Sequence, residues 1–443
     1  MAKCPVPQSH TRRSLLAGLL AAGTAPLIVR ARVLGLGGGV APSNQITLGV
    51  LGTGKQGQVN LKAFLNHADA RITALCDVNE RHLKTARGIL AAHPGAGDGH
   101  VRSYTDFQEL HQDISIDAVV MALPVHWHSI PAAEAVLHGK HLYHEKPMAM
   151  SFAEAAHVRA AVRQEGVVFQ FGTQQRSDLK FRWACELARN GRLGKLIEIQ
   201  VGVEGGLQTE TFPAQAAPQY VDWDRWTGPA PETPFHPAKL DRKFHENISN
   251  FSLGMISCWG IHHLDIAQWG NGTDDTGPVS VEGTGTYPTG GTCDAVLSWK
   301  IRYEYSHAAP ITFASQGKEI THGVKFIGES GWVQVVRNNI WASDPSLLAD
   351  PQNKAGTMPL ALPVSTDHSR NFLDAIKGGS KPLCDIETAV RSDTLCQLAA
   401  AALKARRKLS WDPAAENFGA DTKANSLLAA RPFRGPWKLP ALA

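Results

Sequence analysis

The chain has no strong excess of charge of either sign. Its 443 residues include 44 Lys and Arg residues and 40 Asp and Glu residues, which leaves a formal net charge of +4. So small an excess does not suggest a protein that binds nucleic acid or a membrane surface, and neither partner is expected. The one basic run, Lys404 to Lys408, falls where a helix is expected to end, and cations there interact favourably with the helix dipole.

Paired cysteines are also missing. Seven cysteines are present, and none of them forms a C-x-x-C motif. The spacing therefore indicates no metal site, and a chain of this length does not need disulfides to be stable. Cys4 lies in the N-terminal segment. The other six are expected to be mostly small, buried, apolar residues: Cys76, Cys185, Cys258, Cys293, Cys384 and Cys396.

The sequence contains no apolar run suited to a stable membrane span in the mature chain. Its N-terminal apolar run, which ends near Val29, is short and rich in small residues. Arg12 and Arg13 precede this run, and that layout is typical of a twin-arginine export signal. We therefore expect residues 1–45 to comprise a signal and a glycine-rich linker, the twin-arginine export machinery to be a partner, and the mature protein to be periplasmic or extracellular.

What the sequence does contain is a glycine-rich turn between a strand and a helix. Residues 46–51 form a short apolar run with the length and β-branched content of a buried parallel strand. The turn has the spacing G-x-G-x-x-G, in which Gly52 permits the tight turn, Gly54 lets the backbone approach a pyrophosphate, and Gly57 lets the helix pack on the strand. One face of that helix carries Leu61, Phe64, Leu65 and Ala68.

Asp77 completes a dinucleotide-binding pattern. It ends a second apolar run, 20 residues after the last glycine, where a carboxylate would accept hydrogen bonds from the adenosine ribose. The same carboxylate would repel a 2′-phosphate, so NAD is favoured over NADP, although Arg71 and Arg81 keep NADP open. A glycine-rich turn by itself can have a purely structural role. Here the preceding strand, the following helix and the carboxylate of Asp77 all fit dinucleotide binding. The predicted cofactor-binding residues of this segment are Gly52, Thr53, Gly54, Lys55, Gln56, Gly57 and Asp77.

Short apolar runs alternate with helical patterns as far as Phe171. This alternation is typical of a doubly wound parallel sheet, so the fold class is α/β and residues 46–171 are predicted to form a Rossmann domain that binds NAD. Ligands of such sheets lie at the carboxyl ends of strands. Helices are expected at 79–91, 105–111, 129–138 and 151–164, and further strands at 117–122, 141–144 and 167–171.

The spacing of apolar residues along the chain changes after Lys195. Ile197, Ile199 and Val201 alternate with polar or small residues, which is typical of an antiparallel strand with one solvated face. Residues 172–443 are therefore predicted to form a substrate-binding α+β domain with an open, mainly antiparallel sheet. Strands are expected at 196–204, 279–283, 295–301 and 333–336, late helices at 366–377 and 385–408, and an ordered insertion, rich in Pro and Trp, at 205–250.

Three short strings in this order resemble one known family. They are the glycine turn, the string Glu145-Lys146-Pro147, and the string GIHHLD that ends at Asp265. Together they resemble the glucose–fructose oxidoreductase, inositol dehydrogenase and MocA family. The resemblance runs from Ile46 to near Leu439 and includes a tail like that of exported members. It implies the two-domain fold above, a nicotinamide cofactor and a carbohydrate or cyclitol substrate.

The resemblance places Lys146 and His262 at the reacting atoms. Lys146 follows a predicted strand and precedes a proline, so its ammonium is held where it can polarise a carbonyl or relay a hydroxyl proton. The Lys146–Pro147 bond is implied to be cis. An imidazole with an ordinary pKa of about 6.5 suits His262 as the proton acceptor. Cys258 stands where the family usually has aspartate, and Asp265 is expected to support His262 in its place if the helix turns it inward.

The remaining site residues are assigned partly by resemblance. Trp226 could equally be a core residue, and His263 is taken as structural. Besides the glycine turn and Asp77, the residues expected against the cofactor are Leu123, Pro124, His126, His128, Glu145, Lys146 and Gln174. Aromatic faces and hydrogen-bonding groups suit carbohydrate, and those expected around the substrate are Lys146, Gln175, Arg176, Trp226, Arg242, His245, Cys258 and His262.

Three functions fit these residues. The first is an exported oxidoreductase that keeps NAD(H) bound and moves hydride to or from a secondary hydroxyl of a sugar, cyclitol or glycoside. The second is a redox-neutral glycosidase or lyase that oxidises a hydroxyl, eliminates a neighbouring group and returns the hydride. The third is a non-catalytic protein that binds sugar and nucleotide. The resemblance also implies that open sheets pair face to face, which would give a homo-oligomer.

Overall fold

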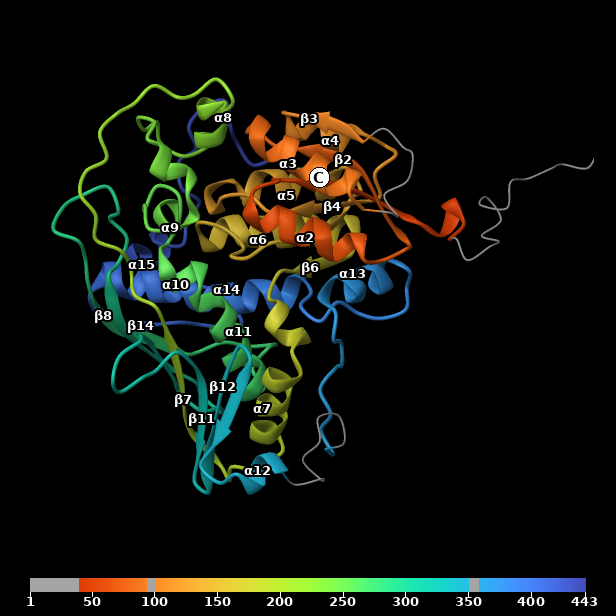
Figure 1. Ribbon diagram of the computed structural model, residues 1–443. Coiled ribbons are helices and arrows are strands. Elements are labelled where there is room, and N and C mark those ends of the chain that lie inside the picture. The colour runs from red at the N-terminus through yellow and green to blue at the C-terminus, as the bar shows by residue number, and fades with distance from the viewer. Residues whose placement is uncertain (1–39, 94–100, 350–357) are drawn as a thin grey trace, which may run out of the picture. The chain divides into compact units, whose positions relative to one another are not determined.

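The computed structural model describes residues 40–93, 101–349 and 358–443. Residues 40–45, the described part of the N-terminal unit, contain one 3-10 turn, η1 (Pro42–Asn44). The predicted export signal, with Arg12 and Arg13, lies outside the described residues. Residues 46–443 form the other unit, which contains two sheets (Figure 1).

The first sheet has six parallel strands in the order β3-β2-β1-β4-β5-β6. This is the order of a doubly wound sheet that binds a dinucleotide where the strand order reverses, at the carboxyl ends of β1 and β4. The predicted Rossmann fold is therefore confirmed. The strands are β1 (Ile46–Leu51), β2 (Ala70–Cys76), β3 (Arg102–Tyr104), β4 (Ala118–Met121), β5 (His141–His144) and β6 (Phe169–Phe171).

Helices cover both faces of this sheet (Figure 1). Leu48 and Val50 of β1 pack in one core with Phe64 of α2 and with residues of α3 and α13. On the other face α4, α5 and α6 pack on the sheet and on one another. Helix α2 ends at Leu65, so Ala68 lies in the turn after it and not on its apolar face. These helices are α2 (Lys55–Leu65), α3 (Glu80–Ala91), α4 (Phe107–Gln112), α5 (Ser129–Leu137), α6 (Phe152–Glu165) and α13 (His368–Ile376).

The second sheet is open and mainly antiparallel, as the alternation of apolar residues predicts. Its order is β13-β12-β11-β7-β10-β9-β8-β14, and only β7 and β10 pair in parallel among its described strands. Ile199 and Val201 of β7 point to the buried face. Its strands are β7 (Leu196–Val203), β8 (Ser280–Thr286), β9 (Ser298–Glu304), β10 (Ile311–Ser315), β11 (Gly323–Gly328), β12 (Gly331–Val336), β13 (Asn339–Ala342) and β14 (Leu409–Ser410).

Three helices pack on this second sheet and join it to the first. Helices α7 (Leu179–Arg189) and α11 (Gly260–Asn271) contact its central and outer strands, and α14 (Ile386–Ala405) contacts β8. Helix α14 also packs on α6 and α11, so it lies between the two sheets (Figure 1). The site residues of both sheets are therefore carried by one continuous packed body.

The predicted insertion after β7 is ordered and returns to the first sheet. Asn79 pairs with Val221 as an isolated bridge, and Arg81 lies 3.5 Å from the ring centre of Tyr220. The insertion and the loops around it contain α8 (Trp223–Thr227), η4 (Pro237–Leu240), α9 (Arg242–His245) and α10 (Met255–Cys258). The remaining short elements are η2 (Val125–Trp127), η3 (Gln174–Ser177), α12 (Ser346–Ala349) and α15 (Thr422–Ser426).

The described residues contain no helix with the length and apolar character of a membrane crossing. The same part of the chain contains no group of three or more His, Cys, Asp or Glu side chains arranged to hold a metal ion. The six cysteines within it are all buried and unpaired.

Candidate active site

The glycine turn joins β1 to α2 in a conformation that other residues would not adopt. Gly52 has φ +84°, and a Cβ on Gly57 would lie 1.9 Å from the carbonyl oxygen of Gly52. The start of α2 is therefore held tightly against the end of β1. Gly54 meets no such obstacle, because a Cβ there would come no closer than 3.6 Å to the ring of His82. The turn thus leaves the N-terminus of α2 open to an anion.

Asp77 follows β2 and is fixed at the edge of the same turn. Its carboxylate accepts the backbone N–H of Thr53 at 2.7 Å and the hydroxyl of Thr53 at 3.0 Å. Its other oxygen accepts the N–H of Asn79 at 2.9 Å. These contacts orient the carboxylate while leaving lone pairs for a ribose hydroxyl.

A cavity of about 390 Å³ lies over this turn. Gly54 and Asp77 line it on one side and Leu123 and Pro124, which follow β4, on another. Its volume falls within the range of small-molecule sites. The open turn, the fixed acid and the cavity fit NAD, with Gly54, Lys55 and Gln56 placed to hold its diphosphate and Asp77 its adenosine ribose.

The insertion closes over this cavity and not over a separate sugar pocket. Trp226, Arg242 and His245, predicted around the substrate, all line the cavity that contains the glycine turn. Trp226 is also buried and stacks on Trp223 with ring centres 4.7 Å apart. Burial lowers the pKa of His245 to about 4, so this ring is neutral. The sequence could not show this placement, because the insertion reaches the turn only through contacts with distant residues.

His126 and His128 lie behind the cavity wall. The side chain of His126 is within 2.9 Å of the Trp226 carbonyl, and His128 faces the carbonyls of Pro147, at 2.5 Å, and Leu123, at 2.8 Å. Both side chains are buried. They are therefore not the direct cofactor contacts that the resemblance implies; His128 instead ties the cavity wall to the segment after Lys146.

Glu145 and Gln174 form a polar network beneath the glycine turn. Glu145 Oε1 accepts hydrogen bonds from Gln174 at 2.9 Å, Asn60 at 3.0 Å and Gln56 at 3.2 Å. Burial raises the pKa of Glu145, and the three amide donors compensate for its loss of water. This network fixes the end of β5, from which Lys146 extends.

Lys146 crosses from the first sheet to the second. Its Nζ donates to the carbonyl of Cys258, at the end of α10, over 2.8 Å, and lies 4.0 Å from Glu246 Oε1. The Lys146 side chain is 9% exposed. The bond between Lys146 and Pro147 is cis, as the resemblance implies. Glu246, which sequence reasoning missed, is thus the carboxylate beside the ammonium; its one signal is the i,i+4 spacing from Arg242.

His262 lies one turn after the residue that Lys146 contacts. Burial and the nearby charge of Lys146 hold the pKa of His262 well below its usual range, so its imidazole is neutral. Its Nδ1 is buried without a hydrogen-bond partner in the described part of the chain. The Cys258 side chain meets Ser252 Oγ at 3.1 Å, and burial raises the pKa of Cys258 to about 12. The thiol is neutral, and the backbone of Cys258 holds the lysine.

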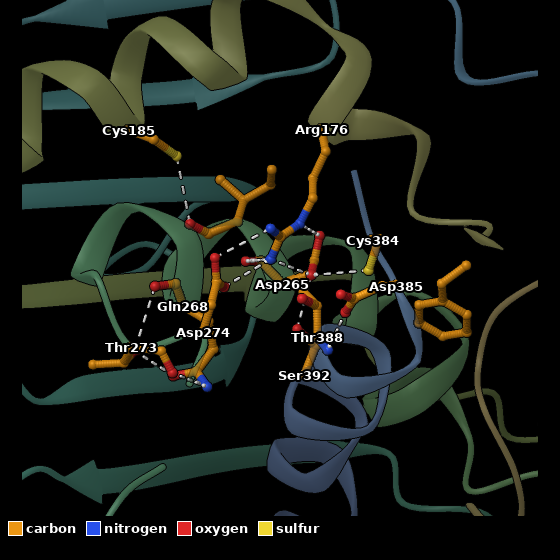
Figure 2. A network of polar contacts seen from close by, with 12 residues as sticks. Arg176, Cys185, Asp265, Gln268, Thr273, Asp274, Cys384, Asp385, Thr388 and Ser392 are labelled. Atoms are coloured by element: carbon orange, nitrogen blue, oxygen red, sulfur yellow. Dashed lines mark hydrogen bonds and ion pairs between the residues drawn. The ribbon is translucent and has the colours of Figure 1, made fainter. Parts of the chain in front are cut away.

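Asp265 of α11 and Arg176 are held together in a polar network (Figure 2). Both Asp265 oxygens accept from Arg176 at 2.8 Å, and Ser392 of α14 donates to one of them at 2.7 Å. Arg176 also pairs with Asp274 at 2.8 Å. The prediction that Asp265 supports His262 is therefore wrong, because α11 turns its carboxylate toward Arg176. Arg176 is predicted to contact the substrate, but its guanidinium forms ion pairs with Asp265 and Asp274 instead.

Gln175 is a predicted site residue whose whole side-chain amide is without partners in the described part of the chain. Its side chain is buried, and both atoms of its amide lack hydrogen-bond partners among the described residues. Buried amides are normally satisfied. Gln175 follows Gln174 of the network beneath the turn, so a ligand in this region would supply the missing partners.

Known proteins match both halves of the chain. Residues 46–173 match the family model described as "Oxidoreductase family, NAD-binding Rossmann fold", and residues 187–439 match "Oxidoreductase family, C-terminal alpha/beta domain". A myo-inositol 2-dehydrogenase of Thermotoga maritima is 27% identical over 33% of this chain and 42% of its own length. A glycosyl hydrolase family 109 protein of a Shewanella species is 34% identical over 30% of this chain and 29% of its own length. The chain thus spans less than half of these curated relatives.

Solved structures match over a larger part of the fold. The WlbA dehydrogenase of Bordetella pertussis, determined in complex with NADH and UDP-GlcNAcA, has a TM-score of 0.60 and 19% identity over 83% of this chain and 99% of that one. Together with the parallel sheet, the glycine turn and Asp77, these matches define an NAD-binding Rossmann fold followed by the C-terminal alpha/beta domain of an oxidoreductase family. The chain belongs to the Gfo/Idh/MocA oxidoreductase family.

Proposed function

We propose that this protein is an exported oxidoreductase that transfers hydride between bound NAD and a secondary hydroxyl group of a sugar, cyclitol or glycoside. One observation carries the proposal: the ammonium of Lys146 is anchored to the turn of backbone that leads into His262, at the end of the cofactor domain. A fixed cation and a neutral imidazole are the two groups that such a reaction requires of the protein.

The two side chains divide the proton chemistry. NAD, when bound, supplies the acceptor or donor of hydride at the carbinol carbon. Because the pKa of His262 is lowered by burial and by Lys146, its ring is free to accept the hydroxyl proton. Nδ1 is buried without a partner among the described residues, and we assign the proton transfer to Nε2. One N–H of the Lys146 ammonium donates to the carbonyl of Cys258. Another of its three N–H groups is available to the substrate oxygen, where it stabilises developing negative charge.

The cofactor is proposed to remain bound through successive turnovers. The insertion lines the cavity with Trp226, Arg242 and His245 and is tied to the loop after β2 by hydrogen bonds from Glu80 N–H to Tyr220 O at 2.9 Å and from Asp222 N–H to Val78 O at 3.1 Å. A covered dinucleotide dissociates slowly, because these contacts must break first. Retention suits a protein that works outside the cytoplasm, where we place it from Arg12 and Arg13.

A redox-neutral glycosidase or lyase is the second candidate. It is supported by the match to a glycosyl hydrolase family 109 protein. In this reaction the same side chains act at the oxidised sugar: Lys146 polarises the new carbonyl, and His262 moves protons during elimination. The cofactor ends each cycle in its starting redox state.

Two measurements on the purified full chain test these proposals. Mass spectrometry of the extracted ligand should find NAD or NADH. Addition of a panel of sugars, cyclitols and glycosides should then change the near-ultraviolet absorbance of the bound nicotinamide, whereas the second candidate predicts release of the aglycone with no lasting change. Absence of nucleotide would contradict both, and bound nucleotide that responds to no member of the panel by either readout would favour a binding protein. Arg12→Lys/Arg13→Lys should abolish export.

A further inference from the structure

Three cations gather beside His262. Lys146 is anchored at Cys258, and Arg242 begins α9 in the insertion. Arg337 lies in the turn between β12 and β13, with its guanidinium 4.5 Å from the ring centre of Trp259. That ring is in turn 5.5 Å from the imidazole of His262. The positive charges of all three side chains lower the pKa of His262, so their fields converge on the proposed proton acceptor.

Only one described carboxylate lies at ion-pair distance from these cations. Glu246 is 4.0 Å from Lys146 and 3.5 Å from Arg242, and its side chain is 12% exposed. Lys146 and Arg242 therefore share one carboxylate at ion-pair distance. Arg242 lines the same cavity as Gly54. The diphosphate of NAD bound there would compensate the positive charge of Arg242. Arg337 remains without a partner among the described carboxylates.

Three other carboxylates lie near Arg337 and contact other groups. Glu145 receives three amide donors beneath the glycine turn. Asp178 caps α7 through the N–H of Lys180 at 2.8 Å. Glu204 faces the ring of His322 at 3.6 Å. Burial and the charge of Arg242 lower the pKa of Arg337, the three carboxylates offset part of this effect, and none of them forms an ion pair with it. Arg337 is an exposed residue whose guanidinium lies against Trp259, so its donors are free for a ligand.

The ring that carries Arg337 also has a free donor. The Nε1 of Trp259 is buried and lacks a hydrogen-bond partner in the described residues, as does Nδ1 of His262. An indole N–H can only donate. A guanidinium stacked on an indole ring suits a ligand that brings acceptor oxygens and negative charge.

We propose that Arg337 and Trp259 form an anion subsite, and that the substrate is a sugar bearing a carboxylate, such as a hexuronic acid or its glycoside. Of the three cations, Arg337 is the one without an ion-pair partner among the described residues, and its single charge matches the single charge of a carboxylate better than the double charge of a phosphate monoester. The planar guanidinium also matches the two oxygens of a carboxylate. The inference rests on the proposed function, because it places the carboxylate beside the carbon that reacts at Lys146 and His262.

Matched pairs of substrates test the subsite. Methyl glycosides of glucuronic and galacturonic acid differ from the parent glucoside and galactoside only in the charged group at one carbon. Binding to the NAD-loaded full chain is measured by calorimetry, and redox change by nicotinamide absorbance. The wild type should bind at least one uronide about tenfold more tightly than its neutral partner, as expected for a charged hydrogen bond. Arg337→Gln should abolish this preference, and Arg337→Lys should retain part of it.

The variant Lys325→Gln is the matched control. Lys325 also lies over a tryptophan, 4.2 Å from the ring centre of Trp332, but it alternates with the buried Val324 and Phe326 and so points away from α11. It should keep the preference for uronides. Sugar phosphates complete the panel, and tighter binding of these by the wild type would overturn the assignment of a carboxylate.

Absence of the anion subsite and absence of the proposed reaction would give different results. Equal or tighter binding of every neutral partner, or a preference that survives Arg337→Gln, overturns the anion subsite even if neutral sugars change the bound nicotinamide. Uronide binding that depends on Arg337, with no redox change and no released aglycone, supports the subsite and contradicts the proposed reaction instead.

Discussion

Loss of the Arg176 side chain should destabilise the folded protein. It is 3% exposed, and its guanidinium meets the fully buried carboxylate of Asp265 through two bonds of 2.8 Å. A buried ion pair contributes little net stability, but removing one partner leaves an uncompensated charge. Arg176→Met should therefore lower the free energy of unfolding by about 3–5 kcal/mol, as measured by urea denaturation.

The partner variant separates this structural role from a catalytic one. Asp265→Asn leaves Arg176 paired with Asp274, so it should cost less stability than Arg176→Met. The variant should also retain hydride transfer. A large loss of turnover in folded Asp265→Asn would restore the catalytic role that the sequence suggests and contradict the structural one.

Single residues differ in how well their sequence neighbourhood predicts them. Lys146 and His262 each sit in a short string attached to a regular element, so spacing alone places them near the end of a strand and in a helix. Glu246 and Arg337 have no such string. They reach the site from the insertion and from a turn between strands, and only the packing of α9 and of β12 with β13 brings them there.

Among the elements, the insertion between β7 and α10 is the one whose contribution to cofactor retention is most easily tested by itself. Tyr220 stacks under Arg81, which lies in the first turn of α3, the helix that follows Asp77. A cation–π contact of this kind contributes about 0.5–1 kcal/mol at an exposed site. Tyr220→Ala should therefore speed the loss of NAD a few-fold while leaving the fold intact.

Nucleotide content after timed desalting checks this expectation. Tyr287→Ala is the control, because Tyr287 follows β8 and is 46% exposed. It should leave retention unchanged. Equal retention in Tyr220→Ala and wild type would show that the insertion does not hold the cofactor.

The regular elements are the part of the fold that the sequence predicts best. Apolar runs with β-branched residues locate the parallel strands, because these are buried on both faces. The sequence does not predict strands β3, β10, β11, β13 and β14 or helix α7, because their short or mixed patterns resemble those of loops. The insertion was predicted to be ordered, but its position depends on long-range contacts that no local period records.

At the scale of the whole molecule, buried histidines make the fold sensitive to acid. Burial lowers the pKa of His128, His245 and His368 to about 4 and that of His144 and His263 to about 3. The unfolded chain, with values near 6.5, binds more protons between these limits, so stability falls as the pH drops. The melting temperature should be steady above about pH 7 and fall steeply from about pH 6.5 to 4.

Asp393 acts in the opposite direction over part of this range. Burial raises the pKa of its carboxyl to about 7, so the folded state holds that proton better than the unfolded state and loses stability as the pH rises from about 4 to 7. One carboxyl is outweighed by five histidines. A melting temperature that stays constant or rises on acidification to pH 4 would contradict the neutral, buried state of these rings.

The single-turnover reduction of bound NAD by a responsive sugar tests the central claim most directly. His262→Asn should slow this reduction by about 100-fold or more, the size expected for loss of a general base, while nucleotide content and sugar affinity change little. His307→Asn, at an exposed position, should behave as wild type. If His262→Asn reduces its NAD at the wild-type rate, the imidazole does not accept the substrate proton and the proposed site is wrong.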